Sequence, residues 1–461
     1  MNVKKIGILL ISLSLILSLS LVAAGQDSDE KETITLKVMT TPHPGPDHYG
    51  YLGPAGDGTT EEEMPEWYEN SPVRVYEKNN PNVDIELDVD IVPKSNYTKQ
   101  LYLAVSSNKK YDLVRVDEMQ VAQIASTGYF TPQFSDEYEE WAEDKGLYDN
   151  FVKGSTYDGD FYGILDRTGS RAIWVWKDVL HEAGYTMEDI STAEGLLEAL
   201  PDITETAKEE FEMSGSLEYP FDGGWVVDQS WGWLYQLGGS ILDKNEDGEW
   251  VPGFNNEAGV KTLNYVKNLV DNGATLQRDW QWQLANFMDR KYAMTYEGSW
   301  AVSAITSEYP DKSHEELTDM IGVIPTTQFE GKELSALAGG WMWMIPRAAP
   351  NPEVAHEVVM TMLNNRKSYA HMLVQEGNLP TSEWMFESPE YKEMVTEDIP
   401  EPWYEQFRRG VAGGVHRPSL EEYSQVEKAF WDATQEVVVN DVPAERALDE
   451  AASEVEKILE K

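Results

Sequence analysis

The sequence predicts an α/β protein with two sets of strand–helix units in one chain. In the first set, stretches of alternating apolar and polar residues, such as Thr33–Thr40 and Pro81–Val92, are followed by segments with helical spacing. Strands and helices that alternate at this length are typical of parallel β–α–β units. A second set begins near residue 160. Because 461 residues are too many for one ordinary hydrophobic core, two domains are expected.

The expected elements follow in chain order. In the first set, Asn96–Ser107 has helical spacing, Tyr111–Val116 is a short buried strand, and Gly128 ends the next helix. About the last 60 residues are expected to be mostly helical. The expected strands and helices of the second set are Phe161–Leu165, Ala172–Trp176, Lys177–Ala183 (ended by Gly184), Thr192–Phe211, Asn256–Asn272 (ended by Gly273), Tyr292–Glu297, Ile321–Pro325, Leu337–Pro346 and Pro352–Leu363.

The composition excludes several classes of function. There are 82 Asp and Glu against 36 Lys and Arg, so the net charge is −46. Nucleic acid and anionic membrane surfaces would repel such a chain. Cysteine is absent, which excludes disulfides and cysteine-based metal sites. A hydrophobic content of 41%, with 16 Trp and 23 Tyr, predicts a large folded core and not a disordered chain.

The first 24 residues have the pattern of a signal peptide. Lys4 and Lys5 precede an apolar run to Val22, and Ala23 and Ala24 supply small residues for cleavage before Gly25. An uncleaved anchor helix is the alternative, since the run is at the short limit for a membrane span. The segment resembles a lipoprotein signal that lacks its Cys, so no lipid anchor is expected there. The mature protein is expected to be exported and soluble, with residues 25–32 as a flexible leader.

The acidic surplus is spread along the whole chain. A global excess indicates a surface adapted to a salt-rich solvent, in which cations screen the repulsion between like charges. An electrostatic role in binding a cationic ligand is the alternative.

Short motifs for metal or nucleotide binding are weak or absent in the sequence. Asp243–Gly248 begins like a calcium loop, but Phe254 stands where a bidentate Glu is needed, and a β-turn explains the same residues. The seven His form no paired metal motif. Nucleophile-elbow and phosphate-loop patterns do not occur. We therefore expect no cofactor, no metal site and no catalytic residues.

Tryptophan is the most informative residue type. Trp225, Trp231, Trp233, Trp300 and Trp341 lie beside Gly or at strand ends and not in apolar helix stripes. Sugar rings have apolar C–H faces and polar edges, so they bind by stacking on aromatic rings while polar groups hold the hydroxyls. Burial in the core is the alternative for each Trp taken alone. Taken together, the set predicts at least one Trp that faces a ligand.

Several segments, in order, resemble the extracellular solute-binding proteins of bacterial ABC sugar importers, the group that includes maltose-binding protein. The matches cover more than half of the chain, and the ordered set is more specific than any one motif. They are Tyr111–Phe130 (YDLVRVDEMQVAQIASTGYF), Tyr162–Asp178 (YGILDRTGSRAIWVWKD), Phe287–Val302 (FMDRKYAMTYEGSWAV), Ile321–Leu363, with its Gly-Gly-Trp strand and Asn-Pro-Glu helix, and Gly377–Thr381 (GNLPT).

The resemblance implies a two-lobed periplasmic-binding-protein fold, similar to type II, with a hinge and an interlobe cleft. Ligand would bind in the cleft, closure would bury it, and a membrane permease would recognise the closed form. A monomer is expected. The implied division of the chain is 33–165 and 326–372 for the first lobe, 166–320 for the second lobe, 321–325 for a hinge crossing, and 373–461 for the hinge return and the C-terminal helices of the second lobe.

The same resemblance implies the residues that hold the ligand. Trp300 and Trp341 would stack on sugar rings, and Asp117, after the third strand, would hold hydroxyls; a helix N-cap is the alternative for Asp117. Asp166 and Arg167 lie at the expected hinge crossing, and Arg171 matches the arginine of the motif. The remaining candidates are Gly340, the second-lobe aromatic residues Tyr219, Phe221, Trp231 and Trp233, the C-terminal residues Arg417 and Tyr423, and Tyr49.

Departures from the family pattern bear on the ligand. Loop Thr41–Glu69 is longer than usual, which makes Tyr49 a candidate contact. Leu165, Arg290 and Glu297 replace the Pro, Gly and small polar residue of the pattern. A sugar or oligosaccharide is the expected ligand. The alternatives are an amine, peptide or osmolyte in the same fold, for which Glu297 and Asp117 could form an acidic cage, or an exported carbohydrate-active enzyme.

Overall fold

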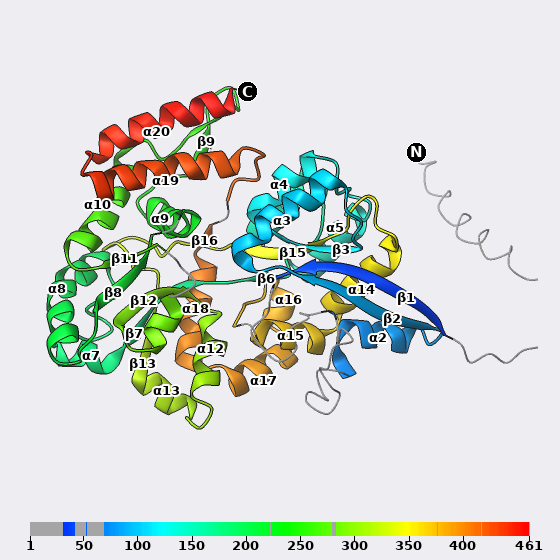
Figure 1. Cartoon of the computed structure of the whole chain (residues 1–461), viewed down its shortest axis with the longest axis horizontal. Helices are drawn as coiled ribbons and strands as arrows, with labels where there is room; N and C mark the ends of the chain where they lie inside the picture. The colour runs from blue at the N-terminus through cyan, green and yellow to red at the C-terminus, as the bar shows by residue number, and fades with distance from the viewer. Residues whose placement is uncertain are drawn as a thin grey trace, which may run out of the picture.

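The computed structural model describes residues 31–41, 52, 69–221, 223–278, 283–375, 377–415 and 417–460. These residues form two lobes that lie side by side, each around its own five-stranded sheet (Figure 1). The expected signal peptide 1–24, residues 25–30 of the expected leader, and Tyr49 lie outside the described residues. No helix of the described part combines the length and apolar character that a membrane crossing requires.

The sheet of the first lobe has the order β2-β1-β3-β15-β6. β1 runs parallel to β2 and β3, and their alternating apolar residues pair in register, as Leu36 does with Leu87. β15 runs antiparallel to both of its neighbours. The strands are β1 (Glu32–Thr40), β2 (Val83–Ile91), β3 (Leu113–Asp117), β6 (Arg167–Thr168) and β15 (Gly340–Met344).

The sheet of the second lobe has the order β11-β8-β12-β7-β13. β11, β8 and β12 are parallel, whereas β7 is antiparallel to β12 and β13. Every residue of β8 is buried, as expected for a central strand covered on both faces. The strands are β7 (Arg171–Trp176), β8 (Gly215–Pro220), β11 (Thr275–Gln277), β12 (Tyr292–Gly298) and β13 (Ile321–Pro325).

Helices cover both sheets (Figure 1). Those of the first lobe and its lower edge are α2 (Pro72–Asn79), α3 (Lys94–Ser107), α4 (Glu118–Ser126), α5 (Ser135–Lys145), α6 (Asp149–Ser155), α14 (Pro352–Asn364), α15 (Arg366–Gln375), α16 (Glu383–Phe386) and α17 (Pro389–Asp398). Those of the second lobe are α7 (Lys177–Glu182), α8 (Ala193–Glu209), α9 (Gly224–Gln236), α10 (Glu257–Asp271), α11 (Gln283–Met288), α12 (Ala301–Glu308), α13 (His314–Met320), α18 (Glu401–Ala412), α19 (Tyr423–Asn440) and α20 (Ala444–Leu459).

The predicted helix ends at Gly128, Gly184 and Gly273 are confirmed. Their φ angles are +70°, +88° and +118°, in the region that glycine adopts without strain. The strand expected over Phe161–Leu165 is wrong, because only residues 160–161 pair, in the small hairpin of β4 (Thr156–Tyr157) and β5 (Asp160–Phe161).

The chain passes between the lobes later than the sequence indicated. β6 pairs in the first sheet and β7 in the second, so the first crossing is at Gly169 and Ser170 and not before Asp166. β13 is an edge strand of the second sheet, so 321–325 is not itself a crossing. That passage comes later, where β14 (Ala336–Leu337) precedes β15 and pairs with β16 (Gly414–Val415). The predicted place of α16 and α17 in the hinge return and second lobe is also wrong, because α16 packs on α5 and α17 packs on α15, which belong to the first lobe. The rest of the division stays a prediction.

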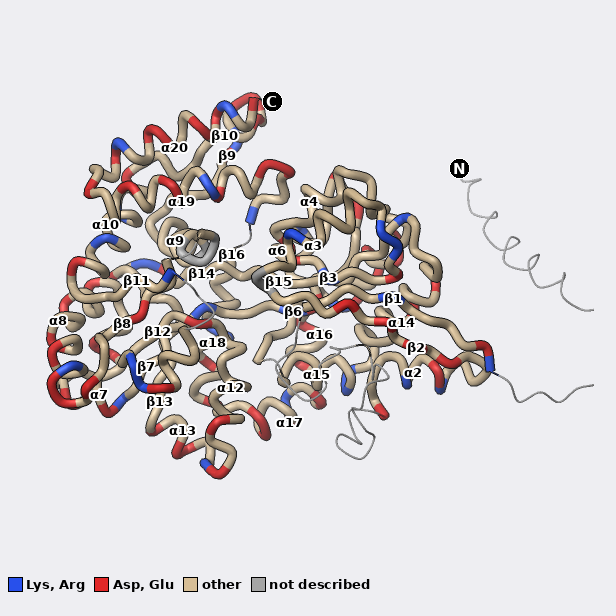
Figure 2. The backbone as a smooth tube through the Cα atoms, viewed as in Figure 1, with Lys and Arg blue, Asp and Glu red and all other residues tan. Residues whose placement is uncertain are grey.

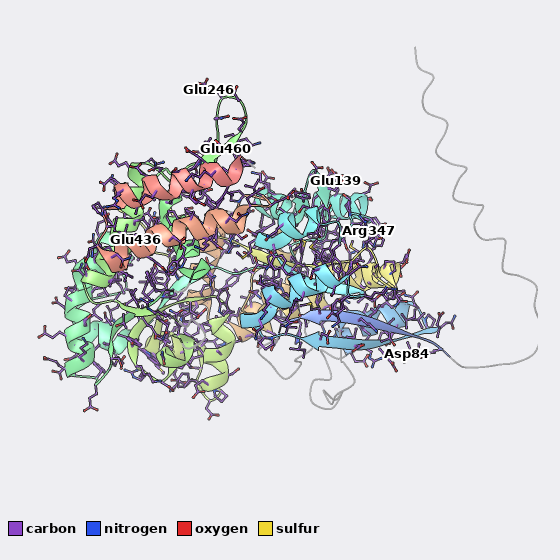
Figure 3. The ribbon with its side chains drawn as sticks, turned by 45° about the horizontal axis from the view of Figure 1, so that its top comes forward. Asp84, Glu139, Glu246, Arg347, Glu436 and Glu460 are labelled. Atoms are coloured by element: carbon purple, nitrogen blue, oxygen red, sulfur yellow. The ribbon has the colours of Figure 1, made fainter. Side chains whose placement is uncertain are left out.

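The calcium-like segment Asp243–Gly248 forms a turn between two short strands. β9 (Leu242–Lys244) and β10 (Trp250–Pro252) are antiparallel, and the Asn245 side-chain oxygen accepts from the backbone N–H groups of Asp247 and Glu249 at 3.0 and 2.9 Å. The hairpin projects beyond α20, with Glu246 at its tip (Figure 3). The β-turn alternative is therefore what the structure shows.

Acidic residues are spread over the outer helices of both lobes (Figure 2). Lys and Arg are fewer, and several pair with neighbouring acids across one helical turn, as Lys428 does with Asp432 at 2.5 Å. Such exposed pairs contribute at most about 1 kcal/mol each. Repulsion between the remaining carboxylates therefore opposes folding at low ionic strength.

We expect salt to stabilise this protein. Raising NaCl from 0.1 to 2 M shortens the Debye length to about 3 Å or less and screens the carboxylate repulsion, so the melting temperature should rise by about 5–10 °C. Differential scanning calorimetry measures the shift, with sucrose as a non-ionic control. A melting temperature that responds equally to sucrose, or not at all to NaCl, would contradict the electrostatic explanation.

Candidate functional site

The candidate site lies where the strand ends of the two sheets meet. β1 and β3 end at Thr40 and Asp117 in the first lobe, and β8 and β12 end at Pro220 and Gly298 in the second. Helices α4 and α12 begin directly after β3 and β12. In open α/β sheets, ligands bind outside the carboxyl ends of the parallel strands, near helix N-termini that carry partial positive charge.

The first crossing holds these two edges close together. Only Gly169 and Ser170 separate Thr168, the last residue of β6, from Arg171, the first of β7. Three peptide steps span at most about 11 Å. Backbone hydrogen bonds fix the crossing to two other segments: Thr168 and Leu379 exchange N–H···O bonds of 3.0 and 2.8 Å, and the Ser299 N–H donates to the Ser170 carbonyl at 2.9 Å.

The edge of the first lobe presents an aromatic ring beside a carboxylate. Trp341 lies directly opposite Asp117 in the β15–β3 pair, so their side chains are neighbours. The Trp341 ring is half-buried and packs edge-on against Tyr97, with 5.8 Å between centroids. The Asp117 side chain is 23% exposed. Its Oδ1 also accepts from the Met119 N–H at 3.2 Å, so Asp117 is the N-cap of α4 as well.

The edge of the second lobe is built around Trp300. Its indole N–H donates to Glu297 Oε1 at 2.6 Å, and the Arg171 guanidinium lies over its ring, 4.7 Å from the centroid. A Cβ at Gly298 would come within 2.1 Å of this ring, so glycine is needed there. Trp300 is half-buried, and it packs against the crossing segment through Gly169.

A C-terminal residue reaches the edge of the first lobe. Arg417 lies between β16 and α19, and its guanidinium is 3.4 Å from Glu118 Oε1 and 4.0 Å from Asp117 Oδ1. Arg417 is only 7% exposed, and the expectation that it binds ligand stays a prediction. Glu118 is the partner that sequence reasoning missed, because one acid among 82 carries no distinguishing signal.

Asp166 and Arg167 do not line an open surface, which corrects the expectation that they bind ligand. Arg115 binds the Asp166 carboxylate through two hydrogen bonds of 2.6 and 2.7 Å, and Arg167 Nε donates to it at 2.9 Å. The three residues are at most 4% exposed. Their carboxylate and guanidinium groups therefore form a buried ion-pair network inside the first lobe.

Burial and ion pairing shift the pKa values of these three groups in opposite directions. Burial alone would raise the pKa of Asp166, but Arg115 and Arg167 outweigh it and hold that pKa below its usual value of 3.8. Burial also lowers the pKa of Arg115 to about 10, although Asp166 favours its charged form. All three groups are charged at neutral pH.

Five predicted aromatic residues are core residues, which corrects the expectation that they face ligand. Tyr219, Phe221, Trp231, Trp233 and Tyr423 are at most 2% exposed. The Trp231 N–H donates to the Tyr423 hydroxyl at 3.0 Å, and the Trp233 N–H donates to the Thr327 carbonyl at 3.2 Å. Trp231 and Trp233 are both buried because α9 packs against α10, α19 and β14.

Gly340 has a packing role in the structure. A Cβ there would lie 2.1 Å from the Arg167 carbonyl, so glycine permits the close approach of β15 and β6. Gly340, which was predicted to contact ligand, instead contacts the neighbouring strand β6. Arg115 was also missed, since a charged residue inside a short apolar strand gives no sign of its partner.

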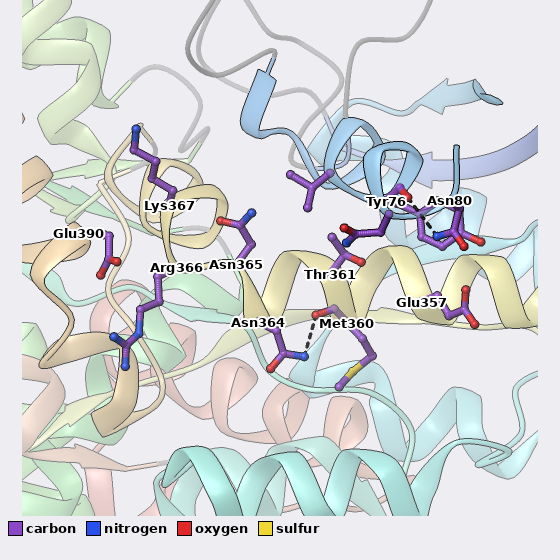
Figure 4. A pocket seen from close by; sticks show the side chains of 12 residues that line it. Tyr76, Asn80, Glu357, Met360, Thr361, Asn364, Asn365, Arg366, Lys367 and Glu390 are labelled. Atoms are coloured by element: carbon purple, nitrogen blue, oxygen red, sulfur yellow. Dashed lines mark hydrogen bonds between the residues drawn. The ribbon is translucent and has the colours of Figure 1, made fainter. Parts of the chain in front are cut away.

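A separate groove of about 830 Å³ lies on the first lobe between α2 and α14 (Figure 4). Asn79, Asn80, Asn364 and Asn365 line it, together with charged residues at the starts of α15 and α17. Tyr76 is its one aromatic residue among the described lining, and burial raises the pKa of that hydroxyl to about 12. None of the predicted site residues that the structure describes lines this groove.

Comparison with known proteins agrees with the two-lobed fold. The sequence model of the family described as bacterial extracellular solute-binding protein matches residues 73–396. The maltodextrin-binding protein MdxE of Bacillus subtilis is 24% identical over 236 residues, which are 49% of this chain and 51% of that protein. The match therefore spans about half the length of this relative.

Solved structures share the two-lobed fold. A solute-binding protein of an ABC transporter from Thermotoga lettingae, bound with α-D-tagatose, has a TM-score of 0.70 at 20% identity and covers 93% of this chain and 100% of its own. The GacH receptor of Streptomyces glaucescens has a TM-score of 0.68 at 20% identity and covers 94% and 100%. Maltose-bound MalE3 of T. maritima has a TM-score of 0.69 at 16% identity and covers 92% and 99%.

We expect Asp166→Asn to lower the free energy of unfolding by about 3–5 kcal/mol at pH 7, because it leaves two buried guanidinium groups without their counter-charge. The folded pKa of Asp166 lies below its unfolded value of 3.8. The charged Asp166 therefore adds to the free energy of unfolding above pH 3.8, and this addition is lost as the pH falls through the folded pKa. The difference between wild type and variant should therefore shrink below about pH 4.

Urea denaturation as a function of pH measures this difference. Asp88→Asn, at an exposed position of β2, is the matched control and should change the free energy by no more than about 0.5 kcal/mol. Equal effects of the two substitutions at pH 7 would show that the Asp166 network does not stabilise the fold.

Proposed function

The chain belongs to the bacterial extracellular solute-binding protein family, whose model matches residues 73–396, and from this premise we propose that it is an exported receptor that captures a sugar or oligosaccharide and delivers it to the permease of an ABC importer. The named relatives support the ligand class, since they include maltodextrin-, maltose- and tagatose-binding proteins. Binding without turnover is part of this proposal, as is a monomer.

The pairing of Trp341 with Asp117 at the edge of the first sheet carries the proposal. A half-buried indole offers an apolar surface to the C–H face of a sugar, and the carboxylate beside it accepts hydrogen bonds from hydroxyls. Trp300 would supply the second aromatic surface from the other lobe. A ligand that contacts both edges favours the closed arrangement by its differential affinity for it.

The charges at the two edges favour a neutral ligand over an amine. Asp117 has Arg417 4.0 Å away, and Glu297 accepts the indole N–H of Trp300. Arg171 already lies over the Trp300 ring, where a cationic ligand would otherwise stack. An acidic cage around a cation would require carboxylates that are not already engaged by a guanidinium or a donor.

Export and the acidic surface belong to the same proposal. The apolar run after Lys4 and Lys5 supports a cleaved signal peptide, and the missing Cys supports a receptor without a lipid anchor at that position. The net charge of −46, spread over the outer helices, supports a protein surface adapted to a salt-rich medium.

We expect maltose, maltotriose or another sugar to raise the melting temperature of the mature protein in a thermal-shift screen of sugars, polyols and amines. Trp341→Ala should weaken binding of the sugar found by about 1–3 kcal/mol, or roughly ten- to a hundredfold, because it removes the stacking surface. Isothermal titration calorimetry measures the affinity.

Trp250→Ala is the matched control, since this half-buried Trp lies on the distant β10 hairpin and should leave the affinity unchanged. A shift produced by amines but by no sugar would refute the ligand class. Product formation from an oligosaccharide panel would instead establish an enzyme.

A further inference from the structure

The segment between β16 and α19 leaves the second lobe, contacts the first and returns. α18, before it, packs on β13 and β7 of the second lobe. α19, after it, packs mainly on α9 and α10 of the second lobe and also touches α4 of the first. Figure 1 shows β16 between the lobes, with α19 extending from it over the second lobe. We call the described residues 413–415, which include β16, and 417–421 the strap.

Hydrogen bonds fix the strap to the passage that leads into β15. The Ala336 N–H donates to the Gly413 carbonyl at 3.3 Å, and the Ala338 N–H donates to the Val415 carbonyl at 2.9 Å. Farther along, Ser419 Oγ donates to the Thr156 carbonyl of the first lobe at 3.0 Å. The strap is thus held on the side of the first lobe by several elements.

Glu118 holds the middle of the strap. Its side chain is 2% exposed, and its Oε1 accepts from both the backbone N–H and the Nη1 of Arg417 at 3.4 Å. The same guanidinium lies over Gly339, where a Cβ would come within 2.4 Å of Nη1. A carboxylate at this depth is far more costly to bury than an exposed one, unless a cation accompanies it.

The contact between Glu118 and Arg417 also bears on the candidate ligand site, because the acid next to Glu118 lies there. Asp117, one residue before Glu118, is the acid that we propose holds sugar hydroxyls, and its Oδ1 lies 4.0 Å from Arg417 Nη1. We propose that Glu118 is a positioning residue for ligand binding: it anchors the strap through Arg417, and so sets a guanidinium donor beside the Asp117 acceptor at the mouth of the site. This inference rests on the proposed function for its ligand.

The first test needs no ligand. Hydrogen–deuterium exchange of the mature chain should show about tenfold faster exchange at Ala338 and Arg417 in Glu118→Gln than in wild type, because the strap loses, among its contacts, the charged pair between Glu118 and Arg417. Glu118→Asp keeps the charge and should restore part of the protection. Glu139→Gln, at an exposed position of α5, changes the net charge equally and should leave exchange unchanged. Unchanged exchange in Glu118→Gln would overturn the anchoring role.

The second test measures maltotriose affinity in Glu118→Gln, Arg417→Gln and the double variant. Glu118→Gln should bind about tenfold more weakly, and in the Arg417→Gln background it should cause no further loss, since Glu118 acts through Arg417. If the double variant loses affinity by the product of the two single-variant losses, the positioning role of Glu118 is overturned. Wild type that binds neither maltotriose nor any other sugar would count against the proposed function, while the exchange experiment still decides the anchoring role of Glu118.

Discussion

Asp166, buried between Arg115 and Arg167, ties together the three strands on which the arrangement of the lobes depends. Arg115 comes from β3 and Arg167 from β6, and β15 lies between these two strands in the sheet. Taking three charged groups out of water is costly, and apolar side chains of similar volume often stabilise a core as well. The ion pairs instead fix the relative position of the strands. Two hydrogen bonds from one guanidinium to one carboxylate set both the distance and the orientation between them.

That geometry determines where the two edges of the candidate site meet. β6 is only two residues long, and the chain leaves it directly for the second lobe through Gly169 and Ser170. The Tyr369 hydroxyl also donates to the Asp166 carbonyl, which ties the network to α15. Backbone hydrogen bonds from Leu379 to Thr168 and from Ser299 to Ser170 hold both ends of this short crossing. Trp341 and Trp300 lie on opposite sides of this crossing.

The sequence predicted the architecture better than the individual site residues. Alternating strands, helix-ending glycines and the ordered family segments depend on local pattern, and local pattern survives folding. The burial of Trp231 and Trp233 could not be predicted in this way, because a Trp beside Gly reads the same on an open loop and on a helix that neighbours cover on several faces. The placement of 321–325 failed for a similar reason, since an edge strand and a crossing share one apolar pattern.

The acidic residues have two different roles in the structure. Many carboxylates lie on the outer helices, where they set the response to salt and carry no information about ligand (Figure 2). A small group, Asp117, Glu118, Asp166 and Glu297, lies near the crossing, and each member is close to an Arg or to an N–H donor. Because these charges balance locally, the edges can present hydrogen-bonding groups without a large net field. A neutral, hydroxyl-rich ligand suits such a surface better than an ion, whose own charge would disturb the pairing that holds the edges in place.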